Sequence, residues 1–124
     1  MPKKNLLIVD DDITSLDIIA LLFEKKGFRV ARTTGGEQAI LDCKNNKPDL
    51  VIMDLMMPGV NGVEATSAIR ASGFTQPIVG FTASSDPALH KDAILAGCNE
   101  ILTKPCRAKA LVERIECIMA EDQT

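Results

Sequence analysis

The chain has 124 residues, of which 46% are hydrophobic and 25% are charged, and its formal net charge is −3. These values are typical of a single globular domain and argue against a disordered chain. The acidic balance and the scarcity of aromatic side chains argue against a nucleic-acid-binding surface, which needs basic and stacking groups. The cysteines form no C-x-x-C pair and the chain has one His, so a zinc site is not expected.

The cysteines and the first residues indicate where the chain acts. Each cysteine lies among apolar neighbours, which predicts small buried side chains in a reducing compartment. These cysteines are Cys43, Cys98, Cys106 and Cys117. The apolar run Leu6–Val9 is followed at once by three acids and is too short for a signal peptide or a membrane span. The sequence therefore predicts a cytoplasmic protein that does not insert into a membrane.

Short apolar runs, typical of buried strands, alternate along the chain with apolar residues at helical spacing. In chain order the predicted elements are strand 5–9, helix 13–26, strand 28–31, helix 36–46, strand 50–53, helix 63–71, strand 77–81, helix 87–96, strand 100–102 and helix 107–120. Gly27 and Gly97 are helix-stopping residues, and Asp86 before Pro87 is a typical helix start. Because the strands are continuously apolar, both faces of the sheet are expected to be covered. We therefore predict one α/β domain over residues 1–124, with a parallel sheet between two helical layers.

Polar side chains follow four of the five predicted strands. Asp10 and Asp11 follow the first strand, Asp54 the third, Thr82 the fourth and Lys104 the fifth. Ligands of parallel α/β sheets bind at the carboxyl ends of the strands, so these side chains are expected to meet at one edge. Several carboxylates together suit Mg²⁺, which binds carboxylate, water and phosphate oxygens. One carboxylate can then attack phosphorus, while the lysine and the hydroxyl balance the charge of the transferred phosphoryl group.

Four segments in this order carry a resemblance to a known family. They read LLIVDD, DLVIMDLMMPGVNG, PIVGFTA and AGCNEILTKP. Together they resemble the receiver domain of two-component response regulators, over essentially the whole chain. The resemblance implies a flavodoxin-like (βα)5 three-layer fold with strand order 2-1-3-4-5. It also implies a function: the domain accepts a phosphoryl group from a sensor histidine kinase or a histidine phosphotransfer protein and signals by a conformational change.

The resemblance also implies a role for each matching residue. Asp54 is the expected phosphoacceptor, and Thr82 and Lys104 are expected to contact the phosphoryl group. The implied ligands of Mg²⁺, or of Mn²⁺ in its place, are Asp11 directly, Asp10 largely through water, Asp54, and the backbone oxygen of Met56. The family has a cis peptide at the matching proline, so the bond between Lys104 and Pro105 is expected to be cis. The domain catalyses only its own phosphorylation and dephosphorylation, so it is not expected to be an enzyme in the usual sense.

Several positions depart from the family pattern. The family usually has an aromatic residue where this chain has Ile101, and often Phe where it has Cys106. Since the chain contains no Tyr, movement of Thr82 is expected to be transmitted by aliphatic repacking. Met56 and Ser84 match positions that modulate attack by water on the acyl phosphate. Met56 cannot orient a water molecule, so we expect slower loss of the phosphoryl group than in chemotaxis-type receivers.

Other functions fit the sequence less well. The run DDDIT also matches the first motif of haloacid-dehalogenase-type phosphohydrolases, with Asp10 as nucleophile and Asp12 as acid/base. That assignment leaves Asp54 without a role and lacks a later acidic motif. A flavin carrier needs a phosphate loop rich in Ser, Thr and Gly after the first strand, and no P-loop motif exists. Within the receiver family, a free-standing regulator and a receiver of a hybrid histidine kinase both fit.

Two further residues receive structural interpretations. Asp12 is expected to be the N-cap or a first-turn acid of the helix that begins near Ile13, rather than a metal ligand. His90 lies beside Lys91 and Asp92 in an amphipathic helix. We therefore interpret His90 as a surface residue and not as a phosphorylated histidine.

Overall fold

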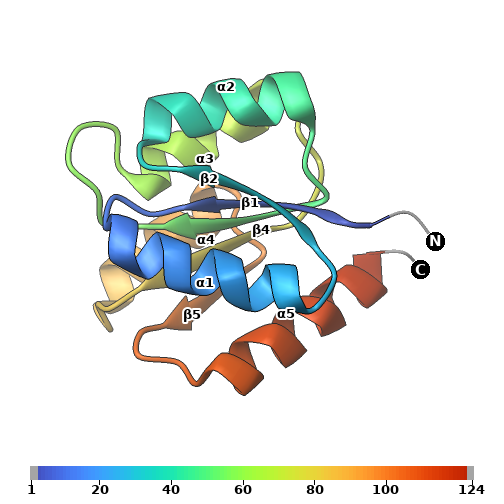
Figure 1. Ribbon diagram of the computed structural model, residues 1–124. Coiled ribbons are helices and arrows are strands. Elements are labelled where there is room, and N and C mark those ends of the chain that lie inside the picture. Colours follow the sequence, from blue (N-terminus) through green and yellow to red (C-terminus); the bar gives the residue numbers. More distant parts are fainter. Residues whose placement is uncertain (1–2, 123–124) are drawn as a thin grey trace.

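The computed structural model describes residues 3–122, which form a five-stranded sheet and five helices (Figure 1). In chain order the elements are β1 Asn5–Val9, α1 Ile13–Lys25, β2 Arg29–Thr33, α2 Gly36–Asn46, β3 Leu50–Asp54, α3 Gly62–Ala71, β4 Ile78–Thr82, α4 Pro87–Ala96, β5 Glu100–Thr103 and α5 Ala108–Asp122. All neighbouring strands are parallel, in the order β2-β1-β3-β4-β5. This order confirms the predicted flavodoxin-like fold.

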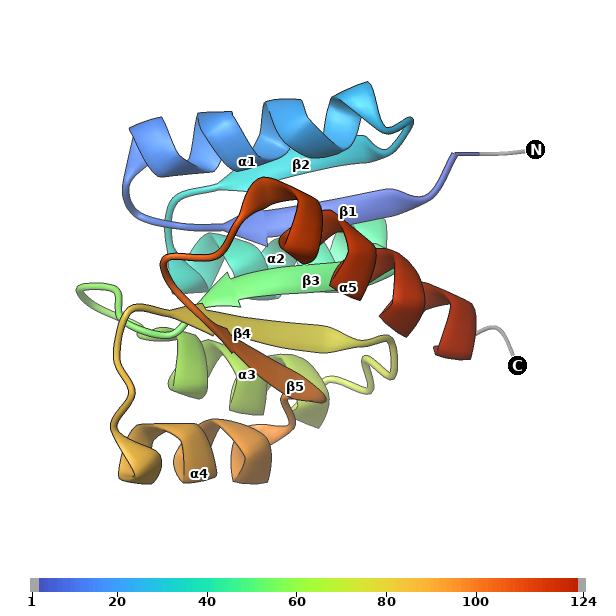
Figure 2. The same ribbon diagram turned by 90° about the horizontal axis from the view of Figure 1, so that it is seen from below.

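Helices cover both faces of the sheet (Figures 1 and 2). On one face, α1 and α5 contribute Leu16, Phe23 and Ile115 to a buried cluster. On the other face, α2, α3 and α4 contribute a second cluster that includes Ala39 and Ile69. The two clusters share the sheet between them, which confirms the predicted three-layer arrangement.

The strand side chains alternate between these two clusters. On β1, Leu6 and Ile8 pack under α1 and α5, whereas Leu7 and Val9 pack against the opposite layer. All four side chains are at most 1% exposed. Because both faces of the strand are buried, β1 is a continuous apolar run rather than an alternating one.

Strand β2 differs from its predicted bounds of 28–31. It begins at Arg29 and ends at Thr33, and it lies at an edge of the sheet. Phe28 instead packs its ring edge-on against Phe23, with 5.5 Å between the ring centroids. The apolar pattern placed the strand too early because an edge strand exposes part of its surface and has a weaker hydrophobic signal.

The cysteine prediction is correct for only part of the set. Cys43 and Cys98 are buried in the second cluster, as expected. Cys106 is half-buried and Cys117 is exposed on α5, so the interpretation of Cys117 as core filling is wrong. Its apolar neighbours along the chain belong to a different face of the same helix.

Within residues 3–122, no helix has the length and hydropathy that a membrane span requires.

Candidate functional site

The carboxyl ends of β1, β3, β4 and β5 meet at one edge of the sheet (Figure 2). The parallel register keeps these ends level: Val9 pairs with Met53, and Asp54 pairs with Phe81. The residues that follow each strand therefore converge although they are far apart in sequence. This edge is where ligands bind in α/β sheets of this kind.

Three acids form a cluster at this edge. One carboxylate oxygen from each of Asp10, Asp11 and Asp54 lies within 4.8 Å of the others. Asp10 and Asp54 are 3% and 7% exposed, whereas Asp11 is exposed. The cluster thus joins two buried acids to a third that opens to solvent.

Backbone groups orient the two buried carboxylates. Asp10 Oδ1 accepts a hydrogen bond of 2.9 Å from the Asp12 N–H. Asp54 Oδ1 likewise accepts a bond of 3.0 Å from the Met56 N–H. In both cases the donor lies two residues downstream, in the turn that leaves the strand. Each turn therefore holds one oxygen of its acid and leaves the other for the centre of the site.

Lys104 bridges the two buried acids. Its Nζ lies 3.0 Å from Asp10 Oδ2 and 3.8 Å from Asp54 Oδ2. The same nitrogen lies 5.2 Å from the centroid of the Phe81 ring, within the range of a cation–π contact. The peptide between Lys104 and Pro105 is cis, as expected. Lys104 is thus fixed against β4 and faces the acids.

The site has a deficit of positive charge. The pKa of Asp54 is raised from 3.8 to about 6, mainly by burial and to a smaller extent by the nearby Asp10. The Met56 N–H and Lys104 act in the opposite direction but do not restore the ordinary pKa. One lysine therefore does not compensate three carboxylates. The donor set consists of hard oxygens, which fits a cation such as Mg²⁺ and the need for more positive charge.

Thr82 and Ser84 form the β4 side of the site. Thr82 is fully buried, and its hydroxyl oxygen accepts a hydrogen bond of 3.1 Å from the Ser84 N–H. Ile101 is half-buried on β5 and packs against the second core cluster. Met56 contacts Asp54 through its backbone N–H, and the residue is 59% exposed.

Gly62 is a site residue that the sequence reasoning missed. A Cβ atom there would lie 2.1 Å from the Asp54 carbonyl oxygen and 2.7 Å from the Leu55 Cα. Asn61 begins α3 with a capping box that includes Glu64, which brings the first turn of the helix back onto the end of β3. The predicted helix began only at residue 63, so Gly62 lay outside it, although a glycine at the start of a helix can signal a close backbone approach.

Asp12 does not join the acid cluster. Its side chain accepts hydrogen bonds from the Thr14 and Ser15 N–H groups, which confirms that it is the N-cap of α1. An exposed capping carboxylate is poorly placed to act as the acid/base that a haloacid-dehalogenase-type mechanism needs beside Asp10. The geometry therefore argues against that alternative.

His90 is less exposed than a plain surface residue. It is half-buried on α4, and its Nε2 lies 2.7 Å from the Ser84 carbonyl oxygen. The sequence interpretation as a surface residue was therefore incomplete. The contact joins α4 to the same loop that contacts Thr82.

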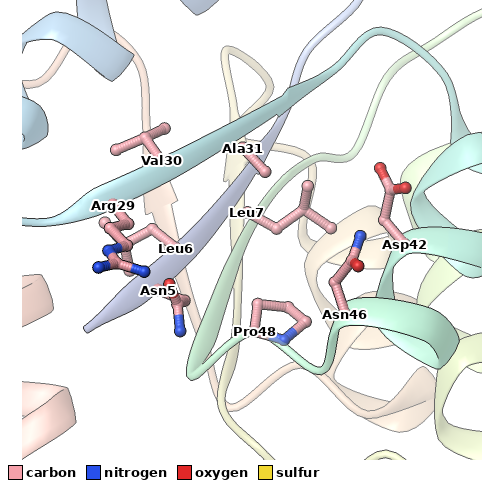
Figure 3. A pocket seen from close by; sticks show the side chains of 9 residues that line it. All are labelled: Asn5, Leu6, Leu7, Arg29, Val30, Ala31, Asp42, Asn46 and Pro48. Atoms are coloured by element: carbon pink, nitrogen blue, oxygen red, sulfur yellow. The ribbon is translucent and has the colours of Figure 1, made fainter. Parts of the chain in front are cut away.

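A separate hollow of about 260 Å³ lies at the amino ends of β1 and β2, beside the end of α2 (Figure 3). Asn5, Arg29, Asp42 and Asn46 are among the side chains that line it. None of the site residues described above lines this hollow. It is therefore distinct from the acid cluster.

Comparison with known proteins agrees with the fold and the motifs. Residues 6–116 match the family described as the response regulator receiver domain. The DNA-binding response regulator MtrA of Mycolicibacterium paratuberculosis is 33% identical over 113 residues, which cover 91% of this chain and 50% of that protein. The CAI-1 autoinducer sensor kinase/phosphatase CqsS of Vibrio cholerae is 30% identical over 116 residues, which cover 91% of this chain and 17% of that protein. The chain thus spans half the length of MtrA or less than a fifth of CqsS.

Solved structures show the same fold. A chain described as a response regulator from Chloroflexus aurantiacus superposes with a TM-score of 0.89 at 34% identity, covering 96% of this chain and 99% of that one. A CheY-like receiver domain protein from Methanospirillum hungatei has a TM-score of 0.94 at 22% identity, covering 98% of both chains, and supports the fold alone. The chain therefore belongs to the family of response regulator receiver domains, which are signalling domains of two-component systems.

Proposed function

We propose that Asp54 accepts a phosphoryl group from a phosphohistidine of a partner protein, in a reaction that requires Mg²⁺. The observation that carries this proposal is the placement of Asp54, a buried carboxylate within 4.8 Å of two other acids and 3.8 Å from a lysine. A carboxylate in such a site can act as a nucleophile towards phosphorus once its charge is balanced. Asp10, Asp11 and the backbone oxygen of Met56 are the proposed metal ligands beside Asp54. Mn²⁺ is the proposed substitute ion.

In the proposed reaction, one bond to phosphorus forms as another breaks. An Asp54 carboxylate oxygen forms a bond to phosphorus while the bond between phosphorus and the partner's imidazole nitrogen breaks, and the imidazole keeps the electron pair. Asp54 must be deprotonated to attack, and its raised pKa of about 6 leaves it mostly ionised at neutral pH. The bound metal would supply positive charge to the phosphoryl oxygens. Lys104 adds a second positive group at a distance that suits the phosphoryl group on Asp54.

Thr82 and Ile101 are the proposed switch residues. The Thr82 hydroxyl is buried at the end of β4 and can donate a hydrogen bond to a phosphoryl oxygen. Ile101 lies on the neighbouring strand and packs against a buried apolar cluster whose side chains are mainly aliphatic. Movement of Thr82 would therefore change the packing of this cluster rather than swing an aromatic ring. Met56 and Ser84 are proposed to govern the lifetime of the acyl phosphate, with Met56 slowing hydrolysis because it cannot orient water.

The proposed partner is a sensor histidine kinase or a histidine phosphotransfer protein. MtrA is named as a DNA-binding regulator and CqsS as a sensor kinase/phosphatase, and both contain a segment similar to this chain. The phosphoryl donor would belong to the same chemical class in either setting. We propose that residues 1–124 act as one cytoplasmic receiver domain that does not itself contact nucleic acid.

Intact mass spectrometry after incubation with acetyl phosphate and Mg²⁺ tests the proposal. The wild-type chain should gain about 80 Da, the mass of one phosphoryl group. It should show no gain when EDTA replaces Mg²⁺ in the incubation. Asp54→Asn should show no gain, while Asp92→Asn, the same change at an exposed position of α4, should behave as wild type. A gain that persists in Asp54→Asn but not in Asp10→Asn would overturn the assignment and favour Asp10 as the nucleophile.

A further inference from the structure

The loop between β4 and α4 contains a chain of hydrogen bonds that begins at the candidate site. The Thr82 hydroxyl oxygen accepts from the Ser84 N–H at 3.1 Å, and the Ser84 carbonyl oxygen lies 2.7 Å from His90 Nε2. A carbonyl oxygen can only accept, so His90 must carry a proton on Nε2 and donate it. The backbone of Ser84 is therefore bonded to Thr82 through its N–H and to the imidazole of His90 through its carbonyl oxygen.

Ser84 is held at three points. Besides the bonds of its N–H and carbonyl groups, its hydroxyl accepts a bond of 3.1 Å from the Asp86 N–H. Asp86 in turn caps α4 through the Ala88 N–H, and its carbonyl accepts from the His90 N–H. The loop therefore forms a closed set of bonds between the end of β4 and the first turn of α4. In this set, the bond from His90 Nε2 joins a side chain of α4 to the backbone of Ser84.

We propose that His90 is a positioning residue that stabilises the resting position of Thr82 through Ser84. This inference rests on the proposed function, in which the Thr82 hydroxyl turns towards a phosphoryl group on Asp54. That turn removes the acceptor of the Ser84 N–H unless the loop follows, and movement of the loop breaks the bond to His90. The imidazole therefore adds to the cost of leaving the resting arrangement.

The consequence is a shift in a two-state equilibrium. A ligand that favours the turned position of Thr82 binds more weakly when the resting state is stabilised, in proportion to that stabilisation. Loss of one hydrogen bond of ordinary strength should therefore tighten binding of such a ligand by about three- to tenfold. Beryllofluoride with Mg²⁺ is a suitable probe because it mimics a phosphoryl group on a carboxylate without being hydrolysed.

The test compares variants of the full chain by calorimetric titration with beryllofluoride in saturating Mg²⁺. His90→Ala should bind about three- to tenfold more tightly than wild type. His90→Gln should retain the wild-type affinity, because its amide nitrogen can replace Nε2 as a donor. His90→Asn is too short to reach Ser84, so it should match the alanine variant and replaces it if that variant does not fold. Lys91→Ala, at an exposed neighbouring position, should leave the affinity unchanged.

Amide hydrogen exchange supplies a readout that overall stability would not move. The Ser84 N–H should exchange faster in His90→Ala than in wild type, while amides in the core of β1 stay protected. Wild-type affinity or weaker binding in both His90→Ala and His90→Asn would overturn this inference and leave the proposed function intact. If wild type itself did not bind beryllofluoride in the presence of Mg²⁺, the proposed function would fail, and the inference with it.

Discussion

Replacement of Asp54 by Asn should stabilise the metal-free protein at neutral and alkaline pH. Burial raises the pKa of this carboxyl group from 3.8 to about 6. Since the folded state holds the proton more tightly than the unfolded chain, stability should fall as the pH rises from about 4 to about 6. Asparagine carries no charge and keeps an oxygen that can accept from the Met56 N–H. Lys104 keeps its closer partner, Asp10, at 3.0 Å.

The magnitude follows from the size of the pKa shift. About two pKa units correspond to about 3 kcal/mol between the two protonation states. This net shift already includes the attraction of Lys104, and the figure is an upper bound because the asparagine amide is itself a buried polar group that costs free energy unless it is hydrogen-bonded. We expect a gain of about 1–2 kcal/mol at pH 8 and a gain of less than about 0.5 kcal/mol at pH 4, where the folded carboxyl group is protonated.

Urea denaturation followed by circular dichroism, in EDTA and at several pH values, measures this difference. Midpoints can be compared directly if the slope of the transition is the same in both proteins. Asp92→Asn is the matched control, since it makes the same chemical change at an exposed position. Added Mg²⁺ should stabilise the wild-type protein more than Asp54→Asn, because a ligand stabilises the folded state that binds it.

Two results would refute this reasoning. Equal stability of wild type and Asp54→Asn at pH 8 would show that the buried carboxylate carries no net cost. A gain of the same size at pH 4 and at pH 8 would show that the effect comes from packing or hydrogen bonding and not from charge.

The remaining predictions concern the residues that build the site. Gly62→Ala should destabilise the fold by about 2–4 kcal/mol in urea denaturation, since its Cβ would lie 2.1 Å from the Asp54 carbonyl oxygen. Gly35→Ala, where no atom of residues 3–122 lies within 4 Å of the new atom, should cost less than about 1 kcal/mol, and equal costs would contradict the steric argument. Asp12→Ala should cost about 1 kcal/mol through loss of the helix cap, yet leave Mg²⁺ affinity within about twofold by calorimetry; a large loss of affinity would make Asp12 part of the metal site. Lys104→Met should raise the pKa of Asp54 further, because Lys104 lowers it, and an unchanged pKa in NMR titration of metal-free protein would refute the ion pair.

The sequence predicted most of the fold because the signals are local. Continuous apolar runs predicted β1 and β3, and the Asp86–Pro87 pair predicted the start of α4, as the structure confirms. The prediction for β2 was shifted because this edge strand is only partly buried, so its apolar pattern is weak. Cys117 was misjudged for a related reason: its neighbours in sequence are apolar, but its own face of α5 is exposed.

The sequence by itself determined that acids, a hydroxyl and a lysine follow strands of one parallel sheet, since the periodicity of the elements and the position of these residues can both be read along the chain. It also predicted that Asp12 is the N-cap or a first-turn acid of α1, because this role depends on the next few residues, and the structure shows the N-cap. Only the tertiary structure decided that Asp10 is buried while Asp11 is exposed, that Gly62 must leave room for the Asp54 carbonyl, and that His90 reaches Ser84. These features depend on how segments distant in sequence pack together, and burial and contact distance arise from that packing.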